Sequence, residues 1–349
     1  MIEILTRRAA LALTALFLTA CSDRLTEPEP QTADITPTAD APDLAATNTW
    51  LTKADMPDTP RDQLAAATIT NSAGQSIVYA IGGHVIGSGR TGRVQAYNVS
   101  TNTWVSRLRW PVAAWNTNGT GVINGKIYIS GGITGDKVFS SQLYVYDPAS
   151  NVWTRKSDMP DDSWGGISGV INNQLYVLTC TELEEDCYDD HTRPELYRYD
   201  PRADQWSFEG YAPTQAGRPF GGVIGGKLYF TGANSLQDGG GARFTVYDPA
   251  TKQFTAKTPL SKARTSGAGY ATLGAKLYIF GGFERQSDGS LLNVRTTRVY
   301  DPATDSWSAG APMPTLRLGI AATRVVLNGK ARIEVVGGPK PGNNLQYLP

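Results

Sequence analysis

An aromatic-Asp-Pro turn recurs at spacings of about 50 residues, and this internal repeat constrains the fold more than any other feature of the chain. The copies are Tyr146-Asp147-Pro148, Tyr199-Asp200-Pro201, Tyr247-Asp248-Pro249 and Tyr300-Asp301-Pro302, with Tyr97-Asn98 as a weaker copy. Seven residues after each Tyr stands a second large aromatic residue: Trp104, Trp153, Trp206, Phe254 and Trp307. A unit of this length buries its apolar face only against its neighbours, so we expect an array of similar units.

Each unit also contains a strand that ends in Gly-Gly. Clear copies lie at residues 79–83, 128–132, 278–282 and 335–338, and the pattern is degenerate at Thr179-Cys180 and Gly232-Ala233. Two-residue hairpin turns such as Asn124-Gly125 precede these strands. The apolar runs are short, rich in β-branched and aromatic residues, and have no helical period. The sequence therefore predicts an all-β fold with four short strands in each repeat.

This pattern resembles the kelch repeat over residues 47–349, which implies a β-propeller. Six positions carry the aromatic residue of the outermost strand: Trp50, Trp104, Trp153, Trp206, Phe254 and Trp307. The chain ends in Tyr347-Leu348-Pro349, which imitates the Tyr-Asp-Pro turn and then stops, and Trp50 supplies its continuation. We therefore predict a six-bladed kelch β-propeller that is closed by the N-terminal strand completing the last blade, because closure removes an exposed strand edge. Five or seven blades would require a missing or an unrecognised repeat.

The N-terminus has the pattern of an export signal. Arg7 and Arg8 precede an apolar run from residue 9 to residue 20, which is too short to span a bilayer and suits a signal peptide. Leu18-Thr19-Ala20-Cys21 resembles the bacterial lipobox, which implies cleavage before Cys21 and lipidation of that residue. A twin-arginine signal is the weaker alternative, and an ordinary signal peptide with a chance cysteine is the other. Because Ser22 rather than Asp follows, the resemblance implies the outer membrane or the cell surface if the host has two membranes.

These signals divide the chain into three parts. Residues 1–20 are expected to be a signal peptide, residues 21–46 a lipidated cysteine followed by a tether, and residues 47–349 the propeller. Residues 22–46 hold four prolines, six acidic residues and one Arg, a composition typical of an extended, disordered spacer. The whole chain has 32 Lys and Arg against 32 Asp and Glu. This balance gives no electrostatic reason to expect a nucleic-acid partner. We expect a monomer that is held at the membrane by its lipid.

The three cysteines fit one scheme. With Cys21 lipidated, Cys180 and Cys187 remain in an exported and oxidising setting, where a disulfide would pin the loop between them. Two free thiols are the alternative. A metal pair is disfavoured because two cysteines without matching histidines supply half of a zinc site.

In kelch domains that bind peptides or sugars, two sets of loops form one face around the central channel. Carried onto this sequence, the loops before the innermost strands place Arg61, Trp115, Trp164, Arg218, Arg264 and Arg317 on that rim. The loops after the Gly-Gly pairs begin with His84, Ile133, Glu182, Asn234, Phe283 and Lys340, of which we include His84, Asn234 and Phe283 in the predicted rim. Guanidinium groups match carboxylates, and indole rings present an apolar face to a sugar or a cation. The alternative is that the arginines are repeat-consensus residues that bond neighbouring loops.

An acidic loop, residues 182–191, holds six carboxylates, which would suit a hard cation, but its spacing matches no EF-hand and a solvated loop is favoured. Galactose oxidase also carries a kelch propeller, with copper held by two His and two Tyr. Here the histidines are His84 and His191, on separate loops, so we expect no copper, no other metal and no cofactor.

The sequence leaves three functions open, and an enzyme is the less favoured class. The leading interpretation is a surface-anchored binding or scaffold module for a protein segment or a glycan at the channel mouth. The second is a carbohydrate-active enzyme that resembles the N-acetylneuraminate epimerase family, which needs an acid/base pair such as Glu284 could join and an Arg for the carboxylate. The third is a structural envelope protein whose rim binds nothing.

Overall fold

The computed structural model describes residues 47–58, 60–136, 138–179, 194–213, 219–231, 242–262, 266–286, 288, 290–340 and 343–349, with the backbone alone for Ala242 and Arg285. The described part of the chain is all-β, as predicted, and contains no helix. Consequently, none of it is a helix long and apolar enough to cross a membrane. The predicted signal peptide and tether, residues 1–46, lie outside these ranges, as do Cys180 and Cys187.

Six four-stranded antiparallel sheets make up most of the described chain, and we number them in chain order. Sheet 1 consists of β3 (Ala65–Thr70), β4 (Ser76–Ile81), β7 (Val94–Asn98) and β8 (Thr103–Arg107). Sheet 2 consists of β9 (Thr120–Ile123), β10 (Lys126–Ser130), β13 (Leu143–Asp147) and β14 (Val152–Arg155). Sheet 3 consists of β15 (Ile167–Ile171), β16 (Gln174–Leu178), β17 (Glu195–Asp200) and β18 (Gln205–Tyr211).

The remaining three sheets repeat this order. Sheet 4 consists of β19 (Gly221–Ile224), β20 (Lys227–Thr231), β21 (Ala242–Asp248) and β22 (Gln253–Leu260). Sheet 5 consists of β23 (Gly269–Leu273), β24 (Lys276–Phe280), β27 (Thr297–Asp301) and β28 (Ser306–Gly310). Sheet 6 consists of β29 (Ile320–Leu327), β30 (Lys330–Gly337), β31 (Asn344–Leu348) and, from the other end of the chain, β1 (Thr49–Thr52).

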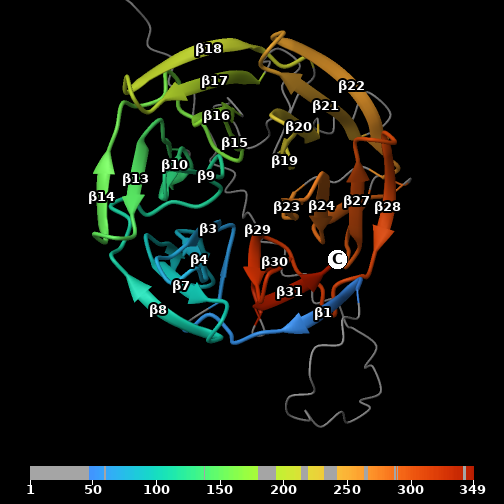
Figure 1. The fold of residues 1–349 in the computed structure, drawn as a ribbon, viewed down its shortest axis with the longest axis horizontal. Helices are drawn as coiled ribbons and strands as arrows, with labels where there is room; N and C mark the ends of the chain where they lie inside the picture. Colours follow the sequence, from blue (N-terminus) through green and yellow to red (C-terminus); the bar gives the residue numbers. More distant parts are fainter. Residues whose placement is uncertain are drawn as a thin grey trace, which may run out of the picture. The chain divides into compact units, whose positions relative to one another are not determined.

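The sheets stand around a central opening, with the first strand of each sheet innermost and the fourth outermost (Figure 1). Each innermost strand contacts that of the next sheet, and β29 of sheet 6 contacts β3 of sheet 1. Short ribbons extend from three sheets: β2 (Arg61–Asp62) with β5 (His84–Val85) and β6 (Gly89–Arg90); β11 (Ile133–Gly135) with β12 (Val138–Phe139); and β25 (Phe283–Arg285) with β26 (Leu291–Asn293).

The hydrophobic core is divided among the junctions between neighbouring sheets. Six clusters of buried side chains lie in the described chain, and each joins residues of two adjacent sheets. At the junction of sheets 6 and 1, for example, Val336 and Val325 pack with Val78 and Tyr97. The two aromatic residues of each repeat lie directly opposite one another on the third and fourth strands, as Tyr146 and Trp153 do. These pairs provide the bulk that fills the widening outer part of each junction.

A polar contact, which we call the clasp, recurs at these junctions. In sheet 2, the side-chain oxygen of Asn151 accepts a hydrogen bond from the Tyr146 hydroxyl at 2.6 Å. It also accepts one from the backbone N–H of Leu108, in the chain that follows sheet 1, at 3.1 Å. The indole of Trp153 returns a bond to the Leu108 carbonyl. Equivalent clasps use Asn102, Asp204, Asp305 and Asn48.

The clasp of sheet 6 is built from both ends of the chain. Asn48 accepts a hydrogen bond from the Tyr347 hydroxyl at 2.7 Å and one from the backbone N–H of Ala311 at 2.6 Å. Trp50 lies opposite Tyr347 and donates its indole N–H to the Ala311 carbonyl. The N-terminal segment therefore performs here the role that an internal loop performs in the other clasps.

Candidate ligand-binding site

A collar of backbone hydrogen bonds surrounds the opening where the chain enters the innermost strands. In each of five sheets, one residue of this entry loop has a positive φ, between 47° and 73°. These residues, which we call the collar, are Gln63, Asn116, Gly165, Gly267 and Gly319. Each donates its N–H to the carbonyl of the residue on the preceding sheet, where both are described: Gly319 to Gly267, Gln63 to Gly319, Asn116 to Gln63 and Gly165 to Asn116, at 2.6 to 3.0 Å. The collar holds neighbouring sheets in register at one mouth of the channel.

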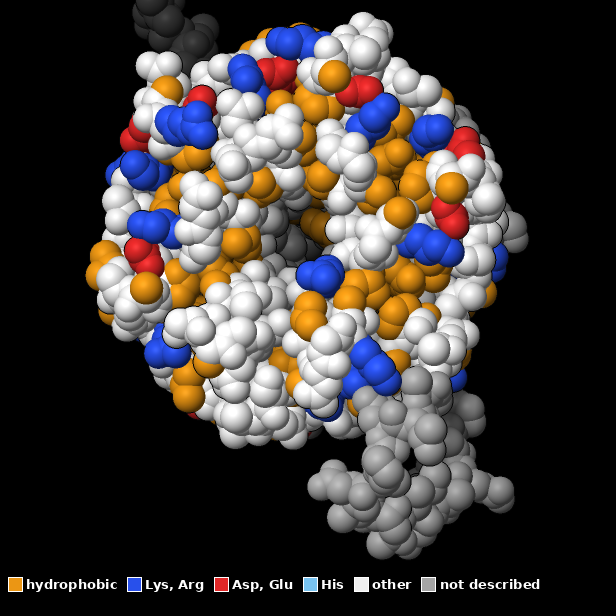
Figure 2. Space-filling view, in the orientation of Figure 1, with side chains coloured by type: hydrophobic (Ala, Val, Ile, Leu, Met, Phe, Trp, Pro, Cys, Tyr) orange, Lys and Arg blue, Asp and Glu red, His pale blue; other side chains and the backbone are white. Residues whose placement is uncertain are grey.

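Below the collar lies a cavity of about 600 Å³ that draws its wall from the innermost strands of all six sheets. That size is typical of a small-molecule site. The lining is mostly small and uncharged, with Gly, Ala, Ser and Thr side chains and three aromatic rings, Phe220, Tyr270 and Phe283. Figure 2 shows one face of the molecule hollowed at its centre, with acidic and basic side chains spread around it.

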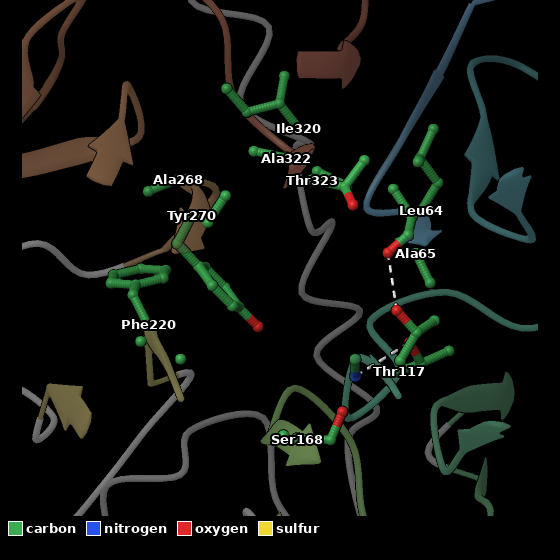
Figure 3. A pocket seen from close by; sticks show the side chains of 18 of the residues that line it. Leu64, Ala65, Thr117, Ser168, Phe220, Ala268, Tyr270, Ile320, Ala322 and Thr323 are labelled. Carbon is green, nitrogen blue, oxygen red and sulfur yellow. Dashed lines mark hydrogen bonds between the residues drawn. The ribbon is translucent and has the colours of Figure 1, made fainter. Parts of the chain in front are cut away.

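Tyr270 is the one large side chain at its level of the channel. Six residues lie at this level, one on the innermost strand of each sheet. In every sheet, this residue pairs with the second-strand residue that stands two positions before the Gly-Gly pair, or before the two residues that replace that pair. The six residues are Ala66, Thr120, Ser168, Gly221, Tyr270 and Ala322. The Tyr270 ring lies 6.1 Å from that of Phe220, and its hydroxyl points into the cavity (Figure 3). Burial raises the pKa of this hydroxyl to about 12, so it is a hydrogen-bond donor at neutral pH.

Two of the predicted rim arginines are buried inside the packing. Arg61 is 1% exposed, and its guanidinium donates to the carbonyls of Gly82 and Arg93 and to the side chain of Gln95. Burial, together with the charge of Arg93, lowers the pKa of Arg61 to about 10. Arg317 is 5% exposed and donates to the Gly337 carbonyl, and burial lowers its pKa. Both side chains stabilise loops next to the Gly-Gly pairs, which is the alternative that the repeat consensus offered.

The predicted aromatic and histidine residues of the rim are only partly available. Trp164 is 3% exposed and stacks on Phe139, so it does not present a face to a ligand. Trp115 is half-buried against the ring of His84. His84 lies 3.3 Å from the Asp62 carboxylate, whose pKa burial raises.

Phe283, also half-buried, lines the cavity. Arg218, Arg264, Asn234 and the acidic loop, residues 182–191, lie outside the described residues, so their part in the rim stays a prediction. Among the residues that are described, no three His, Cys, Asp or Glu side chains gather as a metal site.

Comparison with known proteins finds similarity to kelch-repeat proteins. The kelch motif is matched at residues 117–160 and 264–314. Kelch-like protein 15 of Danio rerio is 32% identical over 202 residues, which are 52% of this chain and 31% of that protein. Kelch-like protein terF of Aspergillus terreus is 27% identical over 269 residues, which are 73% of this chain and 57% of that protein. The chain thus spans less than two thirds of the length of these relatives.

A solved structure, that of YjhT, has the same fold. It superposes with a TM-score of 0.62 at 15% identity, covering 85% of this chain and 96% of its own. This likeness shows the fold, and the motif matches support a kelch-repeat protein.

The sequence analysis missed the residues that shape the cavity. Gln63 and Asn116 adopt a positive φ that no sequence signal announces, although glycines occupy the equivalent collar positions at Gly165, Gly267 and Gly319. Tyr270 has the pattern of an ordinary strand aromatic. Alignment of the innermost strands across the repeats, which sets Tyr270 against Ala, Ser, Thr and Gly, is the signal that would have found it.

Proposed function

We propose that this protein is an exported, lipid-anchored binding or scaffold module, with a closed six-bladed propeller carried on a tether from Cys21. The six sheets and the pairing of β1 with β31 support the blade count and the closure. The collar bond from Gln63 to Gly319, which joins sheets 1 and 6, supports it further. The signal-like residues 1–20 and the lipobox-like residues 18–21 support export and the anchor.

The observation that carries the binding function is the cavity beneath the collar. A rigid mouth of hydrogen-bonded peptide groups lies over a 600 Å³ hollow with few charges. Rigid, largely preformed sites lose little conformational entropy on binding. The ligand class is a protein segment or a glycan that reaches the mouth from outside the cell.

No described residue favours the epimerase alternative. Arg61 and Arg317 are committed to backbone carbonyls. Glu284 is 4% exposed and accepts a hydrogen bond from Thr296, and no carboxylate lines the described cavity wall. The structural alternative agrees with the buried arginines but leaves the hollow mouth without a role.

The test is thermal unfolding of the purified full chain against separate panels of neutral oligosaccharides, N-acetylneuraminate, extended peptides, Ca²⁺ and Cu²⁺. A ligand at 100 times its Kd adds about 2.7 kcal/mol to the free energy of unfolding and raises Tm by several degrees. We expect a shift with peptides or oligosaccharides that is lost in Asn116→Ala and kept in the distant control Thr154→Ala. No shift with either panel would overturn the binding function, and turnover of N-acetylneuraminate would establish the enzyme instead.

The anchor is tested separately. The wild-type chain, expressed in a bacterium, is expected to incorporate labelled fatty acid and to sediment with membranes. Cys21→Ser is expected to remove both properties. A wild-type chain that stays in the soluble fraction without label would exclude the lipid anchor and leave the binding function intact.

A further inference from the structure

Tyr270 crosses the channel from one side of the ring to the other. It stands on β23 of sheet 5, and its hydroxyl lies 3.7 Å from the point where a β-carbon would stand at Gly119, at the entrance to sheet 2. The other five residues at its level are Ala, Thr, Ser, Gly and Ala, so they leave the bore open for this ring. A ligand that enters through the collar therefore meets the tyrosine ring.

Two hydroxyls lie close to Gly119 at this crossing. The Ser168 Oγ lies 3.0 Å from the same β-carbon point at Gly119. It is buried and has no hydrogen-bond partner among the described residues. Other hydroxyls of the wall are engaged, since Thr120 donates to the Ala66 carbonyl at 2.7 Å. A buried polar atom without a partner is costly unless a ligand or water completes it.

The collar adds an unpaired carboxamide oxygen above the hydroxyls. The backbone N–H of Gln63 donates to Gly319, and its carbonyl accepts from Asn116. These two bonds fix the position of the Gln63 backbone, from which its side chain extends. The Gln63 Oε1 is buried and has no partner among the described residues. A carboxamide offers both a donor and an acceptor without a net charge.

The described cavity wall carries almost no charge. Its lining includes no carboxylate and a single cation, Arg324, which is exposed. Arg324 lies on β29 four residues beyond the collar-side Ile320, toward the opposite end of the channel. An anionic ligand at the collar would find no described cation to offset its desolvation.

We infer that the cavity between the collar and Tyr270 binds an uncharged saccharide unit, with its apolar ring face against Tyr270 and its hydroxyls on Gln63, Ser168 and the Tyr270 hydroxyl. This inference rests on the proposed binding function and narrows its ligand to a neutral glycan. An aromatic ring supplies an apolar platform, and the polar groups around it fix the orientation of the sugar. Figure 3 shows Tyr270 and Ser168 extending into the same space.

Isothermal titration calorimetry of the full chain tests this inference. The probes are the neutral trisaccharides of glucose, mannose, xylose and N-acetylglucosamine, with trigalacturonate as the acidic counterpart and an uncharged extended peptide as the protein arm. At least one neutral trisaccharide is expected to bind, and at least tenfold more tightly than trigalacturonate. Tyr270→Phe removes one hydrogen bond and should raise the Kd about fivefold, and Ser168→Ala should do the same.

Tyr211→Phe is the matched control, because Tyr211 is 53% exposed at the end of β18 and far from the cavity wall. Its Kd should equal that of the wild type. Tyr270→Ala should abolish binding, and Tyr270→Phe keeps the inference testable if the alanine variant fails to fold. Binding of the peptide alone, or stronger binding of trigalacturonate, overturns the neutral-glycan inference but leaves the binding function standing. No binding by any probe overturns both, and neutral-sugar binding that is unchanged in Tyr270→Phe and Ser168→Ala overturns the assigned site.

Discussion

At the scale of the residue, the most exceptional group is a carboxyl buried in sheet 6. Glu334 is fully buried, and Gln346 donates a hydrogen bond to its Oε2 at 2.8 Å. Burial raises its pKa from 4.5 to about 8, against the smaller opposing effects of Gln346, Lys53, Asn344 and Arg332. The carboxyl is therefore neutral in the folded chain at pH 7 and ionised in the unfolded chain.

This difference predicts a pH dependence of stability. Between pH 4.5 and about 8 the folded state holds a proton that the unfolded state has released, so the contribution of Glu334 is fully present below pH 4.5 and is lost as the pH rises to about 8. The variant Glu334→Gln removes this dependence. As the pH rises from 5 to 8.5, its free energy of unfolding is expected to increase by about 2 to 4 kcal/mol relative to that of the wild type. Urea unfolding of both chains at the two pH values measures it. A difference between the two chains that does not change with pH would contradict the raised pKa.

At the scale of the element, one junction departs from the clasp. Between sheets 3 and 4 the clasp positions are held by Lys252 and Phe254, which supply neither the side-chain acceptor nor the indole donor. Glu209 of β18 takes over. It accepts a hydrogen bond from the Tyr247 hydroxyl at 3.0 Å and forms ion pairs with Arg198 at 2.7 Å and Lys252 at 3.3 Å. A buried carboxylate with two cationic partners thus replaces the clasp at this junction.

We predict that Glu209→Gln destabilises the protein. The glutamine keeps an acceptor for Tyr247, but it lacks the negative charge that Arg198 and Lys252 face. Half-exposed ion pairs contribute little individually, but the Glu209 side chain is 3% exposed, so a loss of about 1 to 2 kcal/mol is expected. Asp305→Asn at the next junction is the matched control, since it also exchanges a carboxylate for an amide and should cost less. Urea unfolding in 0.05 and 0.5 M NaCl measures both. Equal losses in the two variants would show that the junction of sheets 3 and 4 does not depend on charge.

The aromatic pairs could be predicted from the sequence, whereas the burial of Arg61 and the channel position of Tyr270 could not. The aromatic pairs were predictable because their spacing of seven follows from a turn between two short paired strands, and Trp50 followed from the same spacing. The direction of Arg61 was not, because a loop position does not specify whether a long side chain turns toward solvent or back under the next glycine pair. The channel role of Tyr270 arises from five small residues on other repeats, which no single repeat reveals.

At the scale of the whole molecule, the proposed closure makes a prediction about the two ends of the chain. If the ring is closed, the clasp at Asn48 bears as much of the global stability as the internal clasp at Asn151, because each joins a tyrosine hydroxyl to a backbone N–H across a junction. Asn48→Ala and Asn151→Ala should then cost the same, about 1 to 3 kcal/mol each, through lost hydrogen bonds and a positive φ that alanine disfavours.

Urea unfolding measures the two losses, and amide hydrogen exchange at Leu345, which lies on β31 between β1 and β30, reports whether that strand opens on its own. We expect one cooperative transition in both variants, with Leu345 exchanging at the rate of global unfolding in the wild type. Replacement by Asp at either position keeps the acceptor and should restore most of the loss. If the terminal strand frays independently, Leu345 will exchange fast and Asn48→Ala will leave the global free energy of unfolding unchanged. The collar and the innermost strands alone would then hold the ring closed.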